Sequence, residues 1–227
     1  MELAAIHLAR VMAFLEPIDL NPRGKVFYPD LVAALVARYN FKKFPQNLED
    51  FDEAKGVTFA EGKLGSSVIE QLIIYSHGLL VDTRVSTSES KRLLEEAIRW
   101  ASKELGLVDK PIRRWQYASQ LTFFSDVPLT AVHPAFVRLA EKTAENVTRI
   151  SGESVKYELS AFFVDHDPLS RRHPAGRFSI QRRDNTPFSE NKYFSDAPLP
   201  TDVHLELLEQ FEKDVSANMP SQAKSSR

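Results

Sequence analysis

The sequence predicts an α+β fold with a largely antiparallel sheet and helices packed on one face. Segments with strand-like alternation follow one another, and amphipathic helical segments separate them. The order of segments in the first half recurs in the second, which predicts two pseudo-duplicated β-α-ββ-α halves. Such segments favour two layers, so the opposite face of the sheet would be open to a partner or to a second copy.

The first half opens with a strand and a helix. Residues 6–15 carry closely spaced apolar positions and are followed by Pro17 and Pro22, which suits a strand better than a helix. In residues 29–41 a proline stands in the first turn, and Leu31, Leu35, Val36 and Tyr39 share one helical face. Residues 50–55 form an acidic connector.

Three β-rich runs come next. Residues 56–64 alternate as a strand does, and residues 68–85 read as two runs joined at Ser76, His77 and Gly78. This pattern predicts a hairpin, at whose turn Gly78 is able to take a positive φ.

The helix predicted over residues 86–107 has a start signal, a stripe and a stop signal. Ser86 and Glu89 form a capping box, and Gly106 ends the helix. Between them lies an apolar stripe of Leu93, Leu94, Ala97, Ile98, Ala101 and Leu105.

After a basic link at 110–115 the order begins again. The second half contains three predicted strands and two predicted helices. The strands are residues 117–126, 155–167 and 176–183, and the helices are 133–152, opened by Pro134 and closed by Gly152, and 201–215, capped by Thr201. We therefore expect a first half at 1–108 and a second half at 115–215, together one compact unit, with a disordered tail at 216–227.

The composition of the chain limits the functions that it can have. The 227 residues carry a net charge of −2, so a nucleic acid or an anionic membrane would have to be held by a local patch. There is no cysteine, which excludes disulfides, thiolate nucleophiles and iron–sulfur ligation. The first 17 residues lack the basic start of a signal peptide, and no apolar run reaches the roughly 20 residues that cross a bilayer. These features predict a cytoplasmic protein without a membrane partner.

No catalytic or cofactor motif is present. The Gly-Lys pair in residues 61–67 has the wrong spacing for a phosphate-binding loop, and neither a nucleophile elbow nor a zinc-protease helix occurs. We expect no cofactor, and the pattern favours a protein that is not an enzyme. Four of the six histidines are expected in ordinary surface, capping or turn positions, namely His7, His77, His133 and His204.

One polar stretch, residues 165–194, offers two alternative sites. Asp165, His166, Asp167 and His173 are weak candidates for catalysis, because oxygen and nitrogen ligands of this kind can hold a metal that activates water. Against this, the two aspartates and His166 would point to opposite faces of a strand unless the chain bends, and an Asp-Pro turn is the simpler reading. No metal site is therefore assigned.

The same stretch holds candidates for binding nucleic acid or another partner. They are Arg171, Arg172, Arg177, Arg182, Arg183 and Lys192. Arginines bind phosphates, and nearby aromatic rings can stack on unpaired bases. Alternation puts Arg177, Ser179, Gln181 and Arg183 on one face and Phe178, Ile180 and Arg182 on the other, so Phe178 and Ile180 are expected in the core. Residues 184–194 read as the approach to the last helix.

The function favoured by these features is macromolecular association without catalysis, as an accessory or self-associating subunit of a larger cytoplasmic assembly. A protein partner or self-association fits the open sheet face, and a nucleic acid fits the local basic patch. The alternatives are a metal-assisted hydrolase or nuclease built on residues 165–173 and a nucleic-acid-binding module built on the arginines of residues 171–183.

Overall fold

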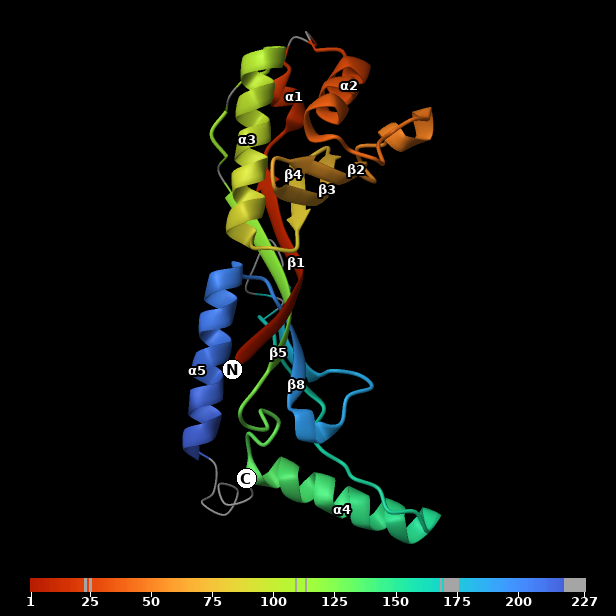
Figure 1. The fold of residues 1–227 in the computed structure, drawn as a ribbon, viewed down its shortest axis with the longest axis vertical. Coiled ribbons are helices and arrows are strands. Elements are labelled where there is room, and N and C mark those ends of the chain that lie inside the picture. The colour runs from red at the N-terminus through yellow and green to blue at the C-terminus, as the bar shows by residue number, and fades with distance from the viewer. Residues whose placement is uncertain are drawn as a thin grey trace. The chain divides into compact units, whose positions relative to one another are not determined.

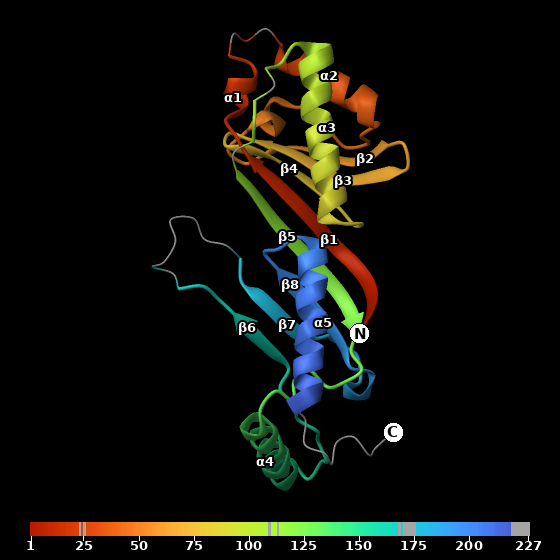
Figure 2. The ribbon, with the colours of Figure 1, turned by 90° about the vertical axis from the view of Figure 1, so that its left-hand side faces the viewer.

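The computed structural model describes residues 1–22, 24, 26–108, 110–112, 114–167, 169 and 176–218. Over these residues the chain is an α+β fold with an eight-stranded sheet and five α-helices (Figures 1 and 2). The strand order is β2-β3-β4-β1-β5-β8-β7-β6, and every pair whose register is defined is antiparallel. The predicted fold class is confirmed.

The elements recur in similar order in the two halves. The first contains β1 (Glu2–Phe14), α1 (Pro17–Leu20), α2 (Tyr28–Tyr39), a 3-10 turn (Leu48–Phe51), β2 (Val57–Leu64), β3 (Ser67–Tyr75), β4 (Gly78–Thr83) and α3 (Thr87–Leu105). The second contains β5 (Arg114–Phe124), α4 (Pro134–Ser151), β6 (Ala161–Val164), β7 (Phe178–Arg182), a 3-10 turn (Phe188–Glu190), β8 (Lys192–Ala197) and α5 (Thr201–Asn218).

The chain divides into two compact units. The N-terminal unit comprises Ile6–Ser119 and Pro198–Asp202, and the C-terminal unit comprises Met1–Ala5, Gln120–Ala197 and Val203–Arg227. The expected boundaries at 1–108 and 115–215 stay a prediction. Of the expected tail at 216–227, residues 216–218 belong to α5 and residues 219–227 lie outside the described part of the chain. No described helix is both long and apolar enough to span a bilayer.

In the N-terminal unit, α2 and α3 pack on one face of strands β1 to β4. The predicted stripes form this core, with Leu35, Leu93 and Leu94 at 4% exposure or less against Val11 and Phe59 of the sheet. The Ser86 hydroxyl accepts the N–H of Glu89 at 3.1 Å, as predicted. The carboxylate of Glu89, however, accepts from Ser67 and Arg92, so the second bond of the predicted capping box is replaced by a link to β3.

Gly78 does not use the positive φ that glycine allows. Its φ lies outside the left-handed region, and the need for glycine comes from close backbone approach instead. A Cβ at this position would lie 2.5 Å from the carbonyl oxygen of Ala13 on the paired strand β1. Only glycine lets β4 begin this close to β1.

In the C-terminal unit, α5 lies across one face of the strands (Figures 1 and 2). Under it the rings of Phe123 and Tyr193 stack at 5.8 Å, and Phe162 contacts Phe211 on α5. The prediction that residues 184–194 only approach the last helix was wrong, because Lys192–Ala197 form strand β8 paired with β7. Apart from Tyr193, the buried residues of β8 are small or carry a hydroxyl group. The strand therefore lacks the alternating large apolar residues by which a strand is usually predicted from sequence.

Two predicted positions of single side chains in this unit can be compared with the structure. His133 precedes α4, where its Nδ1 accepts the N–H of Ala135 at 3.1 Å, as a capping residue does. His204 was expected at an ordinary surface or capping position and is instead completely buried on α5. Its Nε2 lies 2.8 Å from the hydroxyl of Ser195 on β8, so it belongs to the core.

Candidate nucleic-acid interface

Three of the four weak catalytic candidates, Asp165, His166 and Asp167, directly follow β6. The carboxylate of Asp165 accepts the N–H of His166, and that of Asp167 accepts the N–H of Leu169 at 2.9 Å. The Nδ1 atom of His166 lies 3.0 Å from the carbonyl oxygen of Asp167. Among the described residues no three His, Asp or Glu side chains are grouped to hold a metal ion, and His173 lies outside those residues. The bonds are those of an Asp-rich turn.

The predicted arginines divide between the two faces of the sheet. Arg182 lies inside the C-terminal unit, with 7% of its side chain exposed. It donates to the Glu158 carboxylate and to the carbonyl oxygen of Phe188, and its guanidinium covers the Tyr193 ring. It is therefore a structural residue of the core. Arg171 and Arg172 lie outside the part of the chain that the structure describes.

Three cations on the opposite face each lie over an aromatic ring. The guanidinium of Arg177 is 5.3 Å from the ring centre of Phe163, and that of Arg183 is 5.8 Å from Phe194. The Lys192 ammonium is 5.0 Å from the ring centre of Phe124. These six residues, here called the cation–aromatic face, come from strands β5, β6 and β8 and from the two residues that flank β7.

Strand alternation explains why these side chains gather. Phe163 pairs with Ser179 and Phe194 pairs with Gln181, so both phenylalanines point to the face predicted for Arg177 and Arg183. Within the described C-terminal unit, α5 lies on the other face of the sheet, where Phe211 contacts Phe162 and His204 contacts Phe178 (Figure 2). The cation–aromatic face is therefore the face that α5 leaves uncovered.

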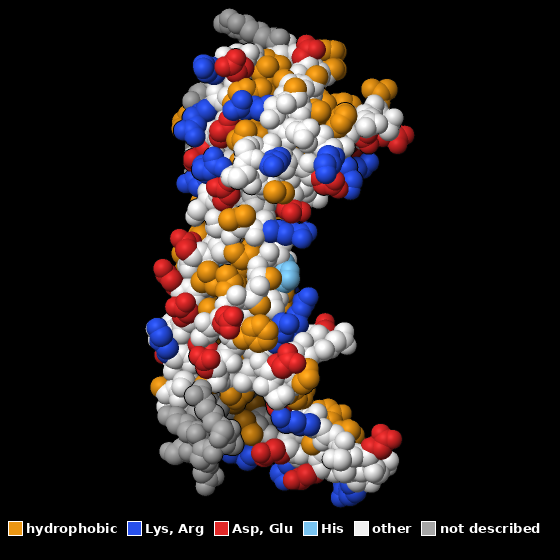
Figure 3. All heavy atoms as spheres, in the orientation of Figure 1, with side chains coloured by type: hydrophobic (Ala, Val, Ile, Leu, Met, Phe, Trp, Pro, Cys, Tyr) orange, Lys and Arg blue, Asp and Glu red, His pale blue; other side chains and the backbone are white. Residues whose placement is uncertain are grey.

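Exposure and charge vary across this face. Phe163 is 54% exposed and the Arg177 side chain 59%, whereas Phe124, Lys192 and Phe194 are half-buried. Two acids lie nearby: Asp165 is 3.9 Å from Arg177, and Asp196 accepts from the amide of Gln120 at 3.1 Å. Figure 3 likewise shows basic and acidic side chains interspersed on the surface that it displays. The face is thus a local basic and aromatic patch without a broad positive field.

Sequence reasoning named Arg177, Arg183 and Lys192 but missed two of their ring partners. Phe163 lies on a strand of only four residues, and Phe124 ends a strand from the start of the second half. The signal that could have found Phe163 is alternation counted through the pairing of β6 with β7, since it sets Phe163 on the same face as Arg183.

Comparisons with known proteins add little. No family model matches the sequence, and no curated protein matches it. Among solved structures, the chain is similar to Methanococcus jannaschii TBP at 10% sequence identity, over 96% of this chain and 99% of that chain, with a TM-score of 0.45. At that TM-score the likeness supports no inference about function.

Proposed function

We propose that the protein binds single-stranded nucleic acid on the cation–aromatic face of its C-terminal unit. The observation that carries this proposal is the set of three cations, Arg177, Arg183 and Lys192, each over a partly accessible phenylalanine ring on an open sheet face. Cations bind the phosphates, and ring faces stack on bases. Unpaired bases fit such a surface because their faces are accessible, whereas a duplex hides them.

The spacing of the face suits a short segment of strand. Neighbouring strands lie roughly 4.8 Å apart, so four strands span about 14 Å, which is enough for two or three stacked bases. A cation over an exposed ring contributes only about 0.5–1 kcal/mol, whereas stacking of a base contributes about 1–3 kcal/mol. A base can therefore displace the cation from the ring, and the displaced cation can then meet a phosphate.

Substitution of two cations tests this proposal. For Arg183→Ala with Lys192→Ala we expect affinity for a labelled single strand of about 12 nucleotides to fall at least about tenfold in fluorescence anisotropy. With three phosphate contacts, the unaltered protein should show a log–log salt slope of about −2, and the double variant a shallower one. Phe163→Ala should weaken binding without changing the slope, because it removes stacking alone.

Lys213→Ala is the matched control, because Lys213 is an exposed cation on α5 of the same unit. Its affinity should equal that of the unaltered protein. An absence of binding at about 50 mM salt, or equal affinity in the double variant, would contradict the proposal. Tighter binding to a duplex than to the single strand would overturn the assignment to unpaired bases.

Association with a second copy of this chain is the second candidate function, and helix α4 favours it. None of the residues of α4 is buried, although the helix is amphipathic. Phe136, Leu139 and Ile150 are 46%, 63% and 83% exposed, and the charged residues occupy the other side of the helix. An apolar helical stripe of this kind ordinarily packs against another element, and a two-fold pair would cover both copies.

Sedimentation of the purified protein tests self-association. We expect a concentration-dependent dimer, and Leu139→Ser with Ile150→Ser should shift it to monomer because both changes place a hydroxyl in the apolar contact. Leu169→Ser, which alters a residue 94% exposed outside α4, should leave the dimer unchanged. A monomer at every concentration would remove this candidate.

A further inference from the structure

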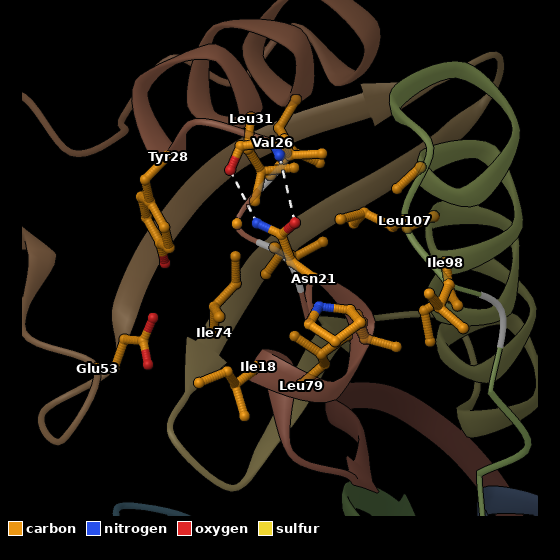
Figure 4. Close-up of a pocket in the computed structure, with 18 of the residues that line it drawn as sticks. Ile18, Asn21, Val26, Tyr28, Leu31, Glu53, Ile74, Leu79, Ile98 and Leu107 are labelled. Carbon is orange, nitrogen blue, oxygen red and sulfur yellow. Dashed lines mark hydrogen bonds between the residues drawn. The ribbon is translucent and has the colours of Figure 1, made fainter.

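The N-terminal unit contains an apolar cavity between the sheet, α2 and α3. Its volume is about 430 Å³, within the range of roughly 300–1,000 Å³ typical of small-molecule sites. Leu31 of α2, Ile74 and Leu79 of the sheet, and Ile98 of α3 line it, together with Ile18 of α1 (Figure 4). The sequence pattern places Leu31 and Ile98 on apolar helical stripes, and nothing in that pattern indicates a space beside them.

The polar side chains at this cavity differ in whether their hydrogen-bonding atoms have partners among the described residues. Asn21 is fully engaged, because its amide donates to the carbonyl oxygen of Val26 at 2.8 Å and accepts the N–H of Val26 at 3.2 Å. The hydroxyl of Tyr28 is buried, and no described residue hydrogen-bonds to it. A buried hydroxyl without a partner is rare in native proteins and calls for a bound group that completes it.

The carboxylate of Glu53 determines which chemical class of ligand suits this cavity. Glu53 lines the same cavity, and Figure 4 shows the Tyr28 hydroxyl directed toward its carboxylate. Burial and the charge of Glu53 raise the pKa of Tyr28 to about 12, so its hydroxyl stays protonated and donates at neutral pH. A ligand here meets one hydroxyl donor and one carboxylate acceptor, a combination that suits an alcohol and repels a second carboxylate.

We propose that this cavity binds a small aliphatic alcohol or a similar neutral amphiphile, with its hydrocarbon body among Leu31, Ile74 and Ile98 and its hydroxyl between Tyr28 and Glu53. At about 30 Å³ for each water-sized group, the volume holds roughly ten to fifteen non-hydrogen atoms. The site lies wholly in the N-terminal unit and is separate from the cation–aromatic face of the C-terminal unit.

Calorimetric titration with three probes of equal chain length tests the proposal. We expect 1-octanol to bind and to raise the melting temperature, and octanoate to bind at least about tenfold more weakly at neutral pH. Tyr28→Phe should weaken octanol binding about fivefold, because it removes the donor and keeps the ring. Octylamine should bind at least as well as octanoate, since Glu53 attracts its ammonium.

Two further variants locate the site. Ala101 lines the cavity from α3, and Ala101→Phe should fill the space and abolish octanol binding. Tyr157→Phe, at a half-exposed tyrosine of the C-terminal unit, should change nothing and is the matched control for Tyr28→Phe. Octanol binding that survives in Ala101→Phe, or that is unchanged in Tyr28→Phe, would overturn the proposal, as would tightest binding of octanoate.

Discussion

Replacing Arg182 with alanine is expected to lower the free energy of unfolding by about 3 kcal/mol. The guanidinium of Arg182 is buried beside the carboxylate of Glu158, and it also donates to the carbonyl oxygen of Phe188 at 3.1 Å. Removing it leaves the Glu158 charge partly buried and that carbonyl without its donor. The size of the loss is moderated because Lys156 lies 2.6 Å from Glu158 and can still neutralise it.

Arg183→Ala is a matched control in the next residue. Arg183 points to the opposite face of β7 and is exposed, so its removal should change the free energy of unfolding by less than about 0.5 kcal/mol. Urea denaturation of both variants compares them directly. Equal losses would show that Arg182 does not hold the core together. Arg182→Met combined with Glu158→Met should recover most of the lost stability, because it removes both charges and fills the space.

Lowering the pH is expected to remove about 3 kcal/mol of stability through His204 alone. Burial lowers the pKa of His204 from 6.5 to about 4 in the folded protein. The unfolded chain therefore takes up a proton near pH 6.5, whereas the folded chain resists it until about pH 4. The contribution is complete above pH 6.5 and is lost as the pH falls toward 4.

Burial of the imidazole ring accounts for this resistance to protonation. Ser195 donates its hydroxyl to the carbonyl oxygen of Ser179 at 2.7 Å, so it accepts from the Nε2 atom of His204 at 2.8 Å. The neutral ring thus already satisfies Ser195, and a charged ring would be buried against the ring of Phe178.

The free energy of unfolding, measured by urea titration from pH 7 to pH 4, tests this expectation. His204→Gln keeps a donor for Ser195 and cannot titrate, so its stability should fall by about 3 kcal/mol less than that of the unaltered protein over this range. His77→Gln, at a histidine whose side chain is 78% exposed, should follow the unaltered protein. Parallel curves for the unaltered protein and His204→Gln would show that His204 does not titrate abnormally.

Local signals predicted much of the fold. The α3 helix begins after Ser86 and ends at Gly106, as its cap and stop residues indicate, because these bonds form within a few residues of sequence. Strand β8 was missed, because a short strand alternating between polar, small and single aromatic residues has little apolar periodicity. Its existence depends on pairing with β7, a contact that local sequence does not specify.

The sequence by itself determined that Arg182 and Arg183 face opposite sides of a strand, since alternation is a property of extended backbone. Only the tertiary structure decided what each side meets: Glu158 and the Tyr193 ring for Arg182, and the Phe194 ring on an open face for Arg183. The cavity beside Tyr28 also belongs to the tertiary structure. Its apolar residues are those of an ordinary core, and the space between them depends on how α2, α3 and the sheet pack.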